Sequence, residues 1–220
     1  MRNPGRFDAT LTLLGRAAIG LALAVALPGC GGGAARDSAA EASPAGASSG
    51  RDFDGALLPV GLTPHPFTLT DQDGRRVSLR EFQGRVVILV FLYSTSQSVS
   101  PLIAQQVRGA LDELGSDARN VSALAISVDP AADTPAHVRA FLRANSLTGR
   151  LEYLTGSAAR LRPVWHAYRI VPASAGERAY EQGALVLLLD RTGAKRVEFP
   201  LEELTPEALA HDVRELQGAP

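Results

Sequence analysis

Two segments of the chain, Val86–Tyr93 and Ala184–Leu189, are apolar throughout. Uninterrupted apolar runs of this length, rich in β-branched residues at the start of the first, predict strands buried on both faces of a sheet. Ser122–Val128 is a third such segment, and Leu151–Leu154 is a weaker one. The pattern therefore predicts a sheet with Val86–Tyr93 in its middle.

Shorter segments flank two predicted turns. Phe67–Thr70 and Arg76–Leu79 are separated by Asp71–Gly74, in which Asp-Gly supplies the positive φ that a tight turn between strands requires. Arg191–Ala194 turns the late apolar strand into a further strand at Arg196–Phe199. We expect a β-hairpin at the N-terminal end of the domain and a reversal of the chain after the late strand.

Four segments have the periodicity and end signals of helices. Pro101 suits the first helical position, and Thr134 and Thr205 are cap residues that precede Pro135 and Pro206. The predicted helices are Leu102–Leu114, Pro135–Asn145, Ser157–Tyr168 with an interruption or restart near Pro163, and Pro206–Leu216. Alternation of these helices with the strands predicts an α/β fold with helices on both faces of a central sheet.

The first residues of the chain resemble a bacterial lipoprotein leader, expected at residues 1–29. Three arginines precede the apolar run Ala17–Leu27, which is too short to cross a bilayer as a helix. The following Leu27–Cys30 resembles a lipobox, in which Cys30 would be diacylated and become the new N-terminus after cleavage. Pro28 is uncommon at its position in that motif. A plain signal peptide with a chance cysteine and an uncleaved membrane anchor are the alternatives.

Residues 30–56 are rich in Gly, Ala and Ser and show no apolar periodicity, which indicates a flexible, lipid-anchored linker. The folded domain is then expected at residues 57–220. This organisation predicts an extracytoplasmic protein, anchored by lipid to the bacterial cell membrane, because two acyl chains give stable anchoring.

Composition excludes several classes of function. The chain has 45% hydrophobic and 20% charged residues and a formal net charge of −1, and the predicted leader removes more positive than negative charge. Nucleic acid is therefore not an expected partner. Cys30 is the only cysteine and Met1 the only methionine. The domain consequently has no disulfide, no thiolate nucleophile and no soft sulfur ligand for Cu(I).

The loop after the first apolar strand is where an open α/β sheet places its ligands. This loop and its neighbours resemble the Sco/SenC family of thioredoxin-fold proteins, whose signature is Phe-x-Tyr-x-x-Cys-x-x-x-Cys-Pro. Here it stands as Phe91, Tyr93, Ser96, Ser100 and Pro101. Further matches in order are Phe67-x-Leu69, Asp73-Gly74, Ser127–Pro130, Asp133–Pro135, Leu154–Gly156 and Leu188–Asp190. The resemblance implies a thioredoxin-like fold with a central mixed sheet, helices on both faces and an N-terminal β-hairpin.

The resemblance also implies a copper site made of the two thiolates of that loop and one imidazole just before the late strand. Ser96, Ser100 and Gln182 occupy those three places here. A serine hydroxyl stays protonated at neutral pH and is a hard donor, so it does not replace a thiolate toward Cu(I). We therefore expect no metal cofactor and no catalytic residue. Tyr93, Pro101, Asp129 and Asp133 would form the rim of the altered site.

Other interpretations of these polar residues remain open. Ser100 suits the N-cap of the helix that begins at Pro101, and Asp129 and Asp133 suit an Asp-Pro turn and a helix cap. A serine hydrolase would need a base near Ser96 or Ser100, but the sequence has no Gly-x-Ser-x-Gly motif and no histidine in this loop. His65, His137, His166 and His211 show no ligand spacing, and Trp165, Tyr168 and Tyr180 are interpreted as core or rim aromatics.

The sequence therefore predicts a binding or assembly protein rather than an enzyme. The resemblance implies a relative of the copper chaperones that mature cytochrome c oxidase, without the residues for copper transfer or thiol exchange. Its expected partners are the membrane, through the lipid anchor, and a respiratory oxidase subunit or a copper-competent paralogue. The alternative is a functional metallochaperone that binds Cu(II) through histidine and carboxylate ligands.

Overall fold

Strand β4 (Val86–Leu92) is the strand around which the main sheet is built, and all seven of its side chains are buried. A computed structural model describes residues 52–218 of the chain. In it β4 pairs in parallel with β5 (Val121–Ser127) and antiparallel with β7 (Leu185–Leu189). Both neighbours are also almost wholly buried, as the apolar pattern predicts.

The main sheet is mixed and has the strand order β1-β8-β7-β4-β5-β6. Its other members are β1 (Ala56–Leu57), β8 (Lys195–Pro200) and β6 (Leu151–Leu154). A separate antiparallel pair, β2 (Thr68–Thr70) and β3 (Arg76–Ser78), is the predicted N-terminal hairpin. Gly74 has φ +88° in its turn, the backbone conformation for which the Asp-Gly pair was expected.

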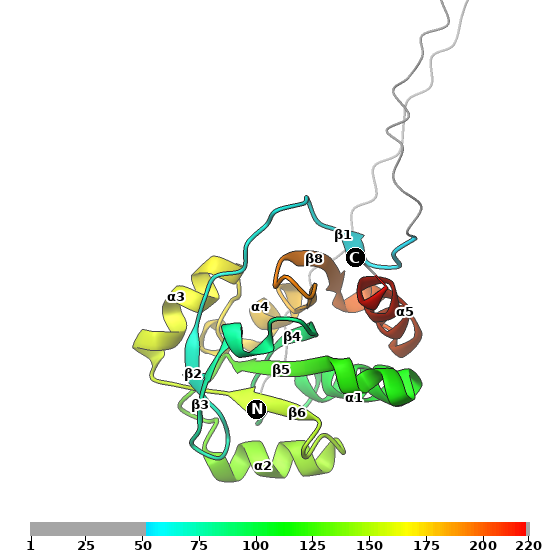
Figure 1. Cartoon of the computed structure of the whole chain (residues 1–220). Helices are drawn as coiled ribbons and strands as arrows, with labels where there is room; N and C mark the ends of the chain where they lie inside the picture. The colour runs from blue at the N-terminus through cyan, green and yellow to red at the C-terminus, as the bar shows by residue number, and fades with distance from the viewer. Residues whose placement is uncertain (1–51, 219–220) are drawn as a thin grey trace, which may run out of the picture. The chain divides into compact units, whose positions relative to one another are not determined.

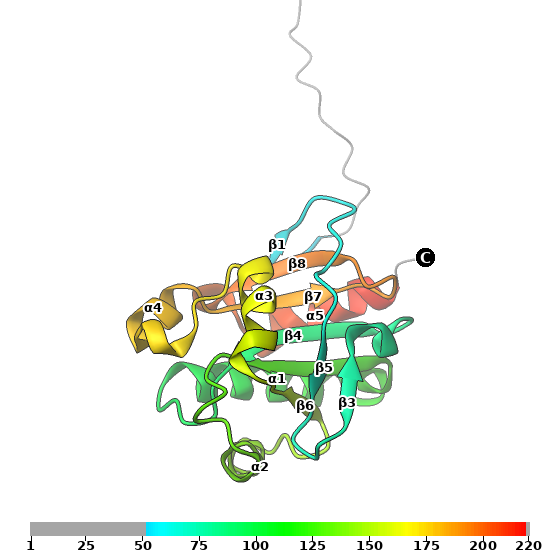
Figure 2. The ribbon, with the colours of Figure 1, turned by 90° about the vertical axis from the view of Figure 1, so that its left-hand side faces the viewer.

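Helices cover both faces of the sheet, which confirms the predicted architecture (Figures 1 and 2). One face carries α1 and α5, which pack against each other, and the other carries α3 together with the β2–β3 hairpin. The helices are α1 (Val99–Leu114), α2 (Pro135–Ala144), α3 (Ala158–Tyr168), α4 (Glu177–Gln182) and α5 (Pro206–Gln217).

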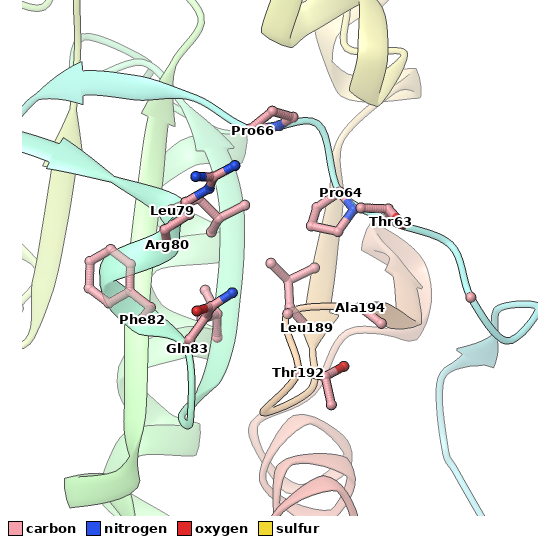
Figure 3. Close-up of a pocket in the computed structure, with 13 residues that line it drawn as sticks. Thr63, Pro64, Pro66, Leu79, Arg80, Phe82, Gln83, Leu189, Thr192 and Ala194 are labelled. Carbon is pink, nitrogen blue, oxygen red and sulfur yellow. The ribbon is translucent and has the colours of Figure 1, made fainter.

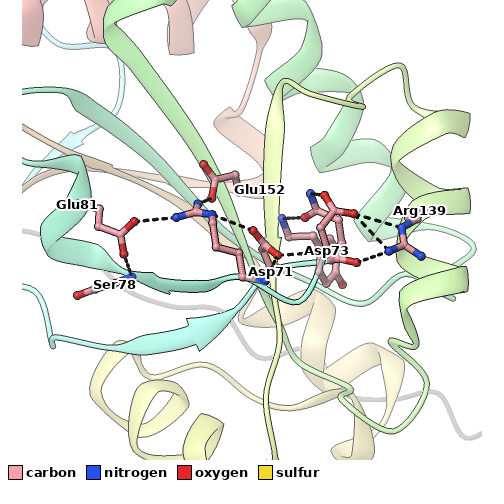
Figure 4. Close-up of polar contacts among 9 residues, drawn as sticks. Asp71, Asp73, Ser78, Glu81, Arg139 and Glu152 are labelled. Carbon is pink, nitrogen blue, oxygen red and sulfur yellow. Dashed lines mark hydrogen bonds and ion pairs between the residues drawn. The ribbon is translucent and has the colours of Figure 1, made fainter.

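Polar contacts fasten the hairpin to β6 (Figure 4). The guanidinium of Arg75 lies 3.2 Å from Asp71, 2.8 Å from Glu81 and 2.6 Å from Glu152 of β6. Beside it, the Tyr153 N–H donates to the side-chain oxygen of Gln72 at 2.9 Å. Exposed ion pairs contribute little singly. Two backbone hydrogen bonds between Thr70 and Thr155, at 2.9 and 2.7 Å, also join the hairpin to the residue after β6.

Three features of the helices differ from the prediction. Helix α1 begins at Val99, so Ser98 rather than Ser100 is its N-cap, and Pro101 lies within its first turn. Helix α3 runs without interruption through Pro163, which is exposed, so the carbonyl that loses its N–H partner stays accessible to water. Helix α4 was not predicted at all; its six residues are too few for a helical period to be recognised.

The N-terminal segment of the described residues joins the domain through one buried carboxylate. Asp212 of α5 is fully buried and accepts hydrogen bonds from the Asp54 N–H at 2.8 Å and the Gly55 N–H at 3.0 Å. A Cβ on Gly55 would lie 2.6 Å from Val197 Cγ1, so only glycine fits there. Ala56, assigned to the linker by its composition, belongs to β1 and pairs with Glu198 of β8.

The predicted leader, Cys30 and most of the predicted linker lie outside the described residues. Within residues 52–218, no helix combines the length and apolar character that crossing a bilayer would require.

We predict that Asp212→Ala lowers the free energy of unfolding by about 1–3 kcal/mol, because it removes the acceptor of two N–H groups, one of them buried. Urea denaturation of the purified protein measures this. The exposed Glu207→Gln on the same helix is the control and should change stability by less than about 0.5 kcal/mol. Equal stabilities of the two variants would contradict a role of Asp212 in fastening β1.

Candidate functional site

Residues 94–98, which we call the serine loop, lie in the connection between the carboxyl end of β4 and the start of α1. Leu92 at the end of β4 is paired with Ser127 at the end of β5, so the loop lies at the edge where the two parallel strands end. Open α/β sheets bind their ligands beyond the carboxyl ends of parallel strands, which is where this loop lies. Ser96 and Ser100, the two residues that the resemblance places where the family has thiolates, are 4% and 0% exposed.

The Ser100 hydroxyl is part of a buried chain of hydrogen bonds. Its Oγ accepts from the Tyr93 N–H at 3.2 Å and lies 3.2 Å from the hydroxyl of Tyr180. The Tyr180 hydroxyl donates to the carbonyl of Phe91 at 2.8 Å. Since a phenol has one proton, Ser100 is the donor in the contact with Tyr180. Burial raises the pKa of Tyr180, which keeps that proton in place.

The expectation that Ser100 caps α1 is therefore wrong, and Ser96 performs part of that task. Ser96 Oγ accepts from the Ser100 N–H at 3.3 Å and more weakly from the Ser98 N–H at 3.5 Å. The first N–H groups of a helix have no partner within the helix, so an acceptor on the preceding loop stabilises its start. Both buried serines are thus hydrogen-bonded to the protein itself.

Helix α4 is the element that the sequence did not reveal and that closes the site from the other side. It brings Tyr180 to Ser100, and the Ser98 hydroxyl donates to Glu181 at 3.3 Å. Gln182, the residue expected from the resemblance at the place of the imidazole, is the last residue of α4 and is exposed. The ring of Tyr180 also packs edge-on against Tyr93 at 5.1 Å. Trp165, Tyr168 and Tyr180 are all buried, which confirms their interpretation as core aromatics.

Asp133 is a second buried polar group at this edge and is joined to the loop. One oxygen of its carboxyl accepts from the Ser94 N–H and hydroxyl, both at 2.6 Å. The other accepts from the Ser127 hydroxyl at 2.5 Å and the Tyr153 hydroxyl at 2.9 Å. Burial raises the pKa of Asp133, although the hydrogen bonds from Ser127, Ser94 and Tyr153 act in the opposite direction.

The interpretation of Asp133 as a helix cap is therefore wrong. Thr134 is the cap of α2 and accepts from the His137 N–H at 3.3 Å. Asp129 does have the turn role expected of it, since its side chain accepts from the Ala132 N–H at 3.3 Å. Asp133 instead holds the start of the serine loop against the end of β5.

Two of the histidines contact groups outside the serine loop. His137 hydrogen-bonds the Ala132 carbonyl at 2.8 Å. His211 lies 3.1 Å from Asp212 and 3.4 Å from Asp54, and the hydrogen bond with Asp212 raises its pKa. The fold thus assembles Asp54, His211 and Asp212 into a group of possible metal ligands that their sequence spacing did not indicate.

A pocket of about 380 Å³ lies away from the serine loop (Figure 3). Val87 and Leu189, a paired couple at the amino end of β4, form part of its lining, with Leu79 and Phe82 opposite. Its polar groups include Arg80 and Gln83. None of the residues expected at the altered metal site lines it.

Comparison with known proteins indicates the family of this chain. The family profile described as SCO1/SenC matches residues 59–218. The chain is 33% identical over 106 residues to the Arabidopsis thaliana protein named "Protein SCO1 homolog 2, mitochondrial". That match covers 48% of this chain and 38% of the relative, so the chain spans well under half of the relative's length.

Solved structures support the same fold. The copper-bound ScoI of Bradyrhizobium japonicum is 32% identical, with a TM-score of 0.57, over 70% of this chain and 99% of that one. BsSco, described as a member of the Sco family of cytochrome c oxidase assembly proteins, is 23% identical, with a TM-score of 0.63, over 75% and 99%. At that identity the second match concerns the fold alone. The thioredoxin-like fold expected from the sequence is confirmed.

We predict that Ser100→Ala lowers the free energy of unfolding by about 1–3 kcal/mol, because the buried Tyr93 N–H loses its acceptor and Tyr180 loses a donor. Thermal or urea denaturation measures the change. Ser116→Ala, at an exposed serine just after α1, is the control and should change stability by less than about 0.5 kcal/mol. If the two variants are equally stable, the Ser100 hydroxyl is not structural.

Proposed function

Because the chain belongs to the SCO1/SenC family, we propose that it is a lipid-anchored, extracytoplasmic assembly or binding protein that does not itself bind Cu(I) or exchange thiols. The family is related to the copper chaperones of cytochrome c oxidase. One observation carries the proposal: the chain has a single cysteine, Cys30, which precedes the domain. The positions at which the resemblance places two thiolates hold Ser96 and Ser100.

The contacts of these serines support a structural role for the loop. Each hydroxyl accepts from a backbone N–H of the loop or helix start, and Ser100 also donates to Tyr180. Soft Cu(I) is held by thiolate and thioether ligands, and the described domain has neither. The shape of the family's site would persist while its donors are replaced. The proposed partners are a respiratory oxidase subunit or a copper-competent paralogue, with no enzymatic reaction.

The second candidate, a metallochaperone with histidine and carboxylate ligands for Cu(II), has the group Asp54, His211 and Asp212 in its favour. However, both carboxylate oxygens of Asp212 already accept hydrogen bonds from the backbone N–H groups of Asp54 and Gly55, just before β1. These hydrogen bonds explain the position of Asp212 without a metal. The group also contains no residue of the serine loop. Copper content of wild type and His211→Ala separates the candidates, since only the second predicts that the substitution removes bound Cu(II).

We predict that the purified protein does not retain Cu(I) against a chelating competitor. The triple variant Ser96→Cys, Ser100→Cys and Gln182→His should gain a one-to-one Cu(I) complex, because two thiolates beside a helix start and an imidazole on α4 would then be available. Chelator competition measures both. A wild-type protein that holds Cu(I) would overturn the proposal.

The single variants and the double cysteine variant are controls and should bind far more weakly, since one or two donors do not replace three convergent ones. Circular dichroism checks that each variant folds, which matters because Ser100 is fully buried. A folded triple variant without copper would mean that the loop and α4 do not preserve the family's ligand geometry.

We predict that Cys30 carries the lipid anchor. A bacterial host grown with a labelled fatty-acid analogue should label the wild-type protein and not the Cys30→Ala variant, because the lipobox cysteine is the acylated residue. Gel fluorescence after affinity purification measures the label. Equal labelling of the two proteins, or none on wild type, would contradict the anchor.

A further inference from the structure

Exposed apolar side chains are concentrated in one short segment. Among residues 52–218, the exposed large apolar side chains are Leu57, Val60, Leu62 and Leu102. Three of these four lie between positions 57 and 62 and are 56%, 84% and 41% exposed. Scattered single exposed apolar residues are ordinary, but a cluster in one loop indicates a contact surface. We call residues 57–62 the apolar loop.

The apolar loop is held in place by backbone hydrogen bonds at both ends. The Leu58 N–H donates to the Arg196 carbonyl at 2.8 Å, and the Leu62 carbonyl accepts from the Lys195 N–H at 2.9 Å. Between these points Gly61, with φ +88°, turns the chain beside Val60. In both views the loop projects beyond β8 at one end of the domain (Figures 1 and 2). Val60 is therefore presented to solvent by a fixed backbone.

Cationic side chains lie next to the apolar loop. Arg191, on the turn between β7 and β8, and Arg196, near the start of β8, line a hollow together with Val60. Asp190 lies 3.3 Å from Arg196. The loop is hydrogen-bonded to the backbone of β8. Apolar side chains flanked by cations are the combination that binds the interfacial region of an anionic lipid surface. Asp52 and Asp54 lie on the preceding segment and limit the positive charge there.

The chain outside the structure indicates what this surface faces. It ends at Arg51, six residues before Leu57, and includes Cys30, the proposed lipid anchor. A linker of the composition expected for residues 30–56 would have a root-mean-square span of roughly 25 Å between Cys30 and Asp52, short enough to keep the apolar loop beside the membrane. This step rests on the proposed anchor.

We propose that the apolar loop and the adjoining β7–β8 turn form a lipid-contact surface. Leu57, Val60 and Leu62 enter the interfacial region of the bilayer, and Arg191 faces anionic headgroups. The contact orients the domain on the membrane, in addition to the anchor that keeps it there.

The test measures contact of position 60 with lipid. The full-length protein carrying Val60→Cys, labelled with a thiol-reactive fluorophore, is reconstituted into phosphatidylcholine–phosphatidylglycerol vesicles that contain a lipid with a nitroxide quencher near its headgroup. The control is Leu102→Cys, a similarly exposed apolar position on α1. We expect quenching at position 60 to exceed that at position 102 several-fold, and to decrease in vesicles of phosphatidylcholine alone. The wild-type protein, treated with the same fluorophore, shows how much label Cys30 takes up.

Equal quenching at positions 60 and 102 would overturn the proposal and would favour a protein partner for the loop. Quenching at position 60 that does not depend on phosphatidylglycerol would overturn the headgroup contact of Arg191. Fatty-acid labelling of Cys30 reports on the anchor independently, so failure of the anchor and failure of the loop contact are distinguishable. Quenching at position 60 in a protein without acylated Cys30 would establish the loop contact without the anchor.

Discussion

The burial of β4 on both faces is the constraint on which the rest of the structure depends. Its seven apolar side chains are each worth about 1.5–3 kcal/mol when removed from water, so this strand can lie only at the centre of a covered sheet. No polar group fits between Val86 and Leu92. The polar residues that follow consequently gather at its carboxyl end, where the 94–98 loop, Asp133 and helix α4 meet.

That meeting point has the position of a thioredoxin-like functional site but a different chemistry. In a site with thiolates, the side chains at these places would face a metal or a disulfide partner. Here Ser96 and Ser100 are directed into hydrogen bonds with Tyr93, Tyr180 and the start of α1. A buried hydroxyl without a partner is costly, so such internal pairing is what keeps serine acceptable in so enclosed a place. The proposed loss of copper chemistry thus fits with a loop that contributes to stability.

The segment where the described residues begin exposes apolar side chains, whereas the carboxyl end of β4 buries polar ones. Asp212 and Gly55 fix β1 on β8, and the loop after β1 then exposes its apolar residues instead of burying them. Such exposure costs solubility unless a second surface covers the residues. A proposed lipid anchor a short distance away in the sequence gives the exposed side chains a nearby apolar environment, which connects the local structure of residues 54–62 with the proposed place of the protein in the cell.

The sequence by itself determined the hairpin, the main helices and the strands of the sheet other than β1, because continuous apolar runs, an Asp-Gly turn and threonine caps are local signals. It also determined that the domain lacks sulfur, since that is a matter of composition. Only the tertiary structure decided the roles of Ser100, Asp133 and Asp212, because each depends on partners far along the chain: Tyr180 for Ser100, Ser94 for Asp133 and Gly55 for Asp212. Hydrogen bonds between distant segments leave no periodicity in the sequence, so side-chain types that suit a cap or a turn acquire their actual function only when the fold brings those partners within reach.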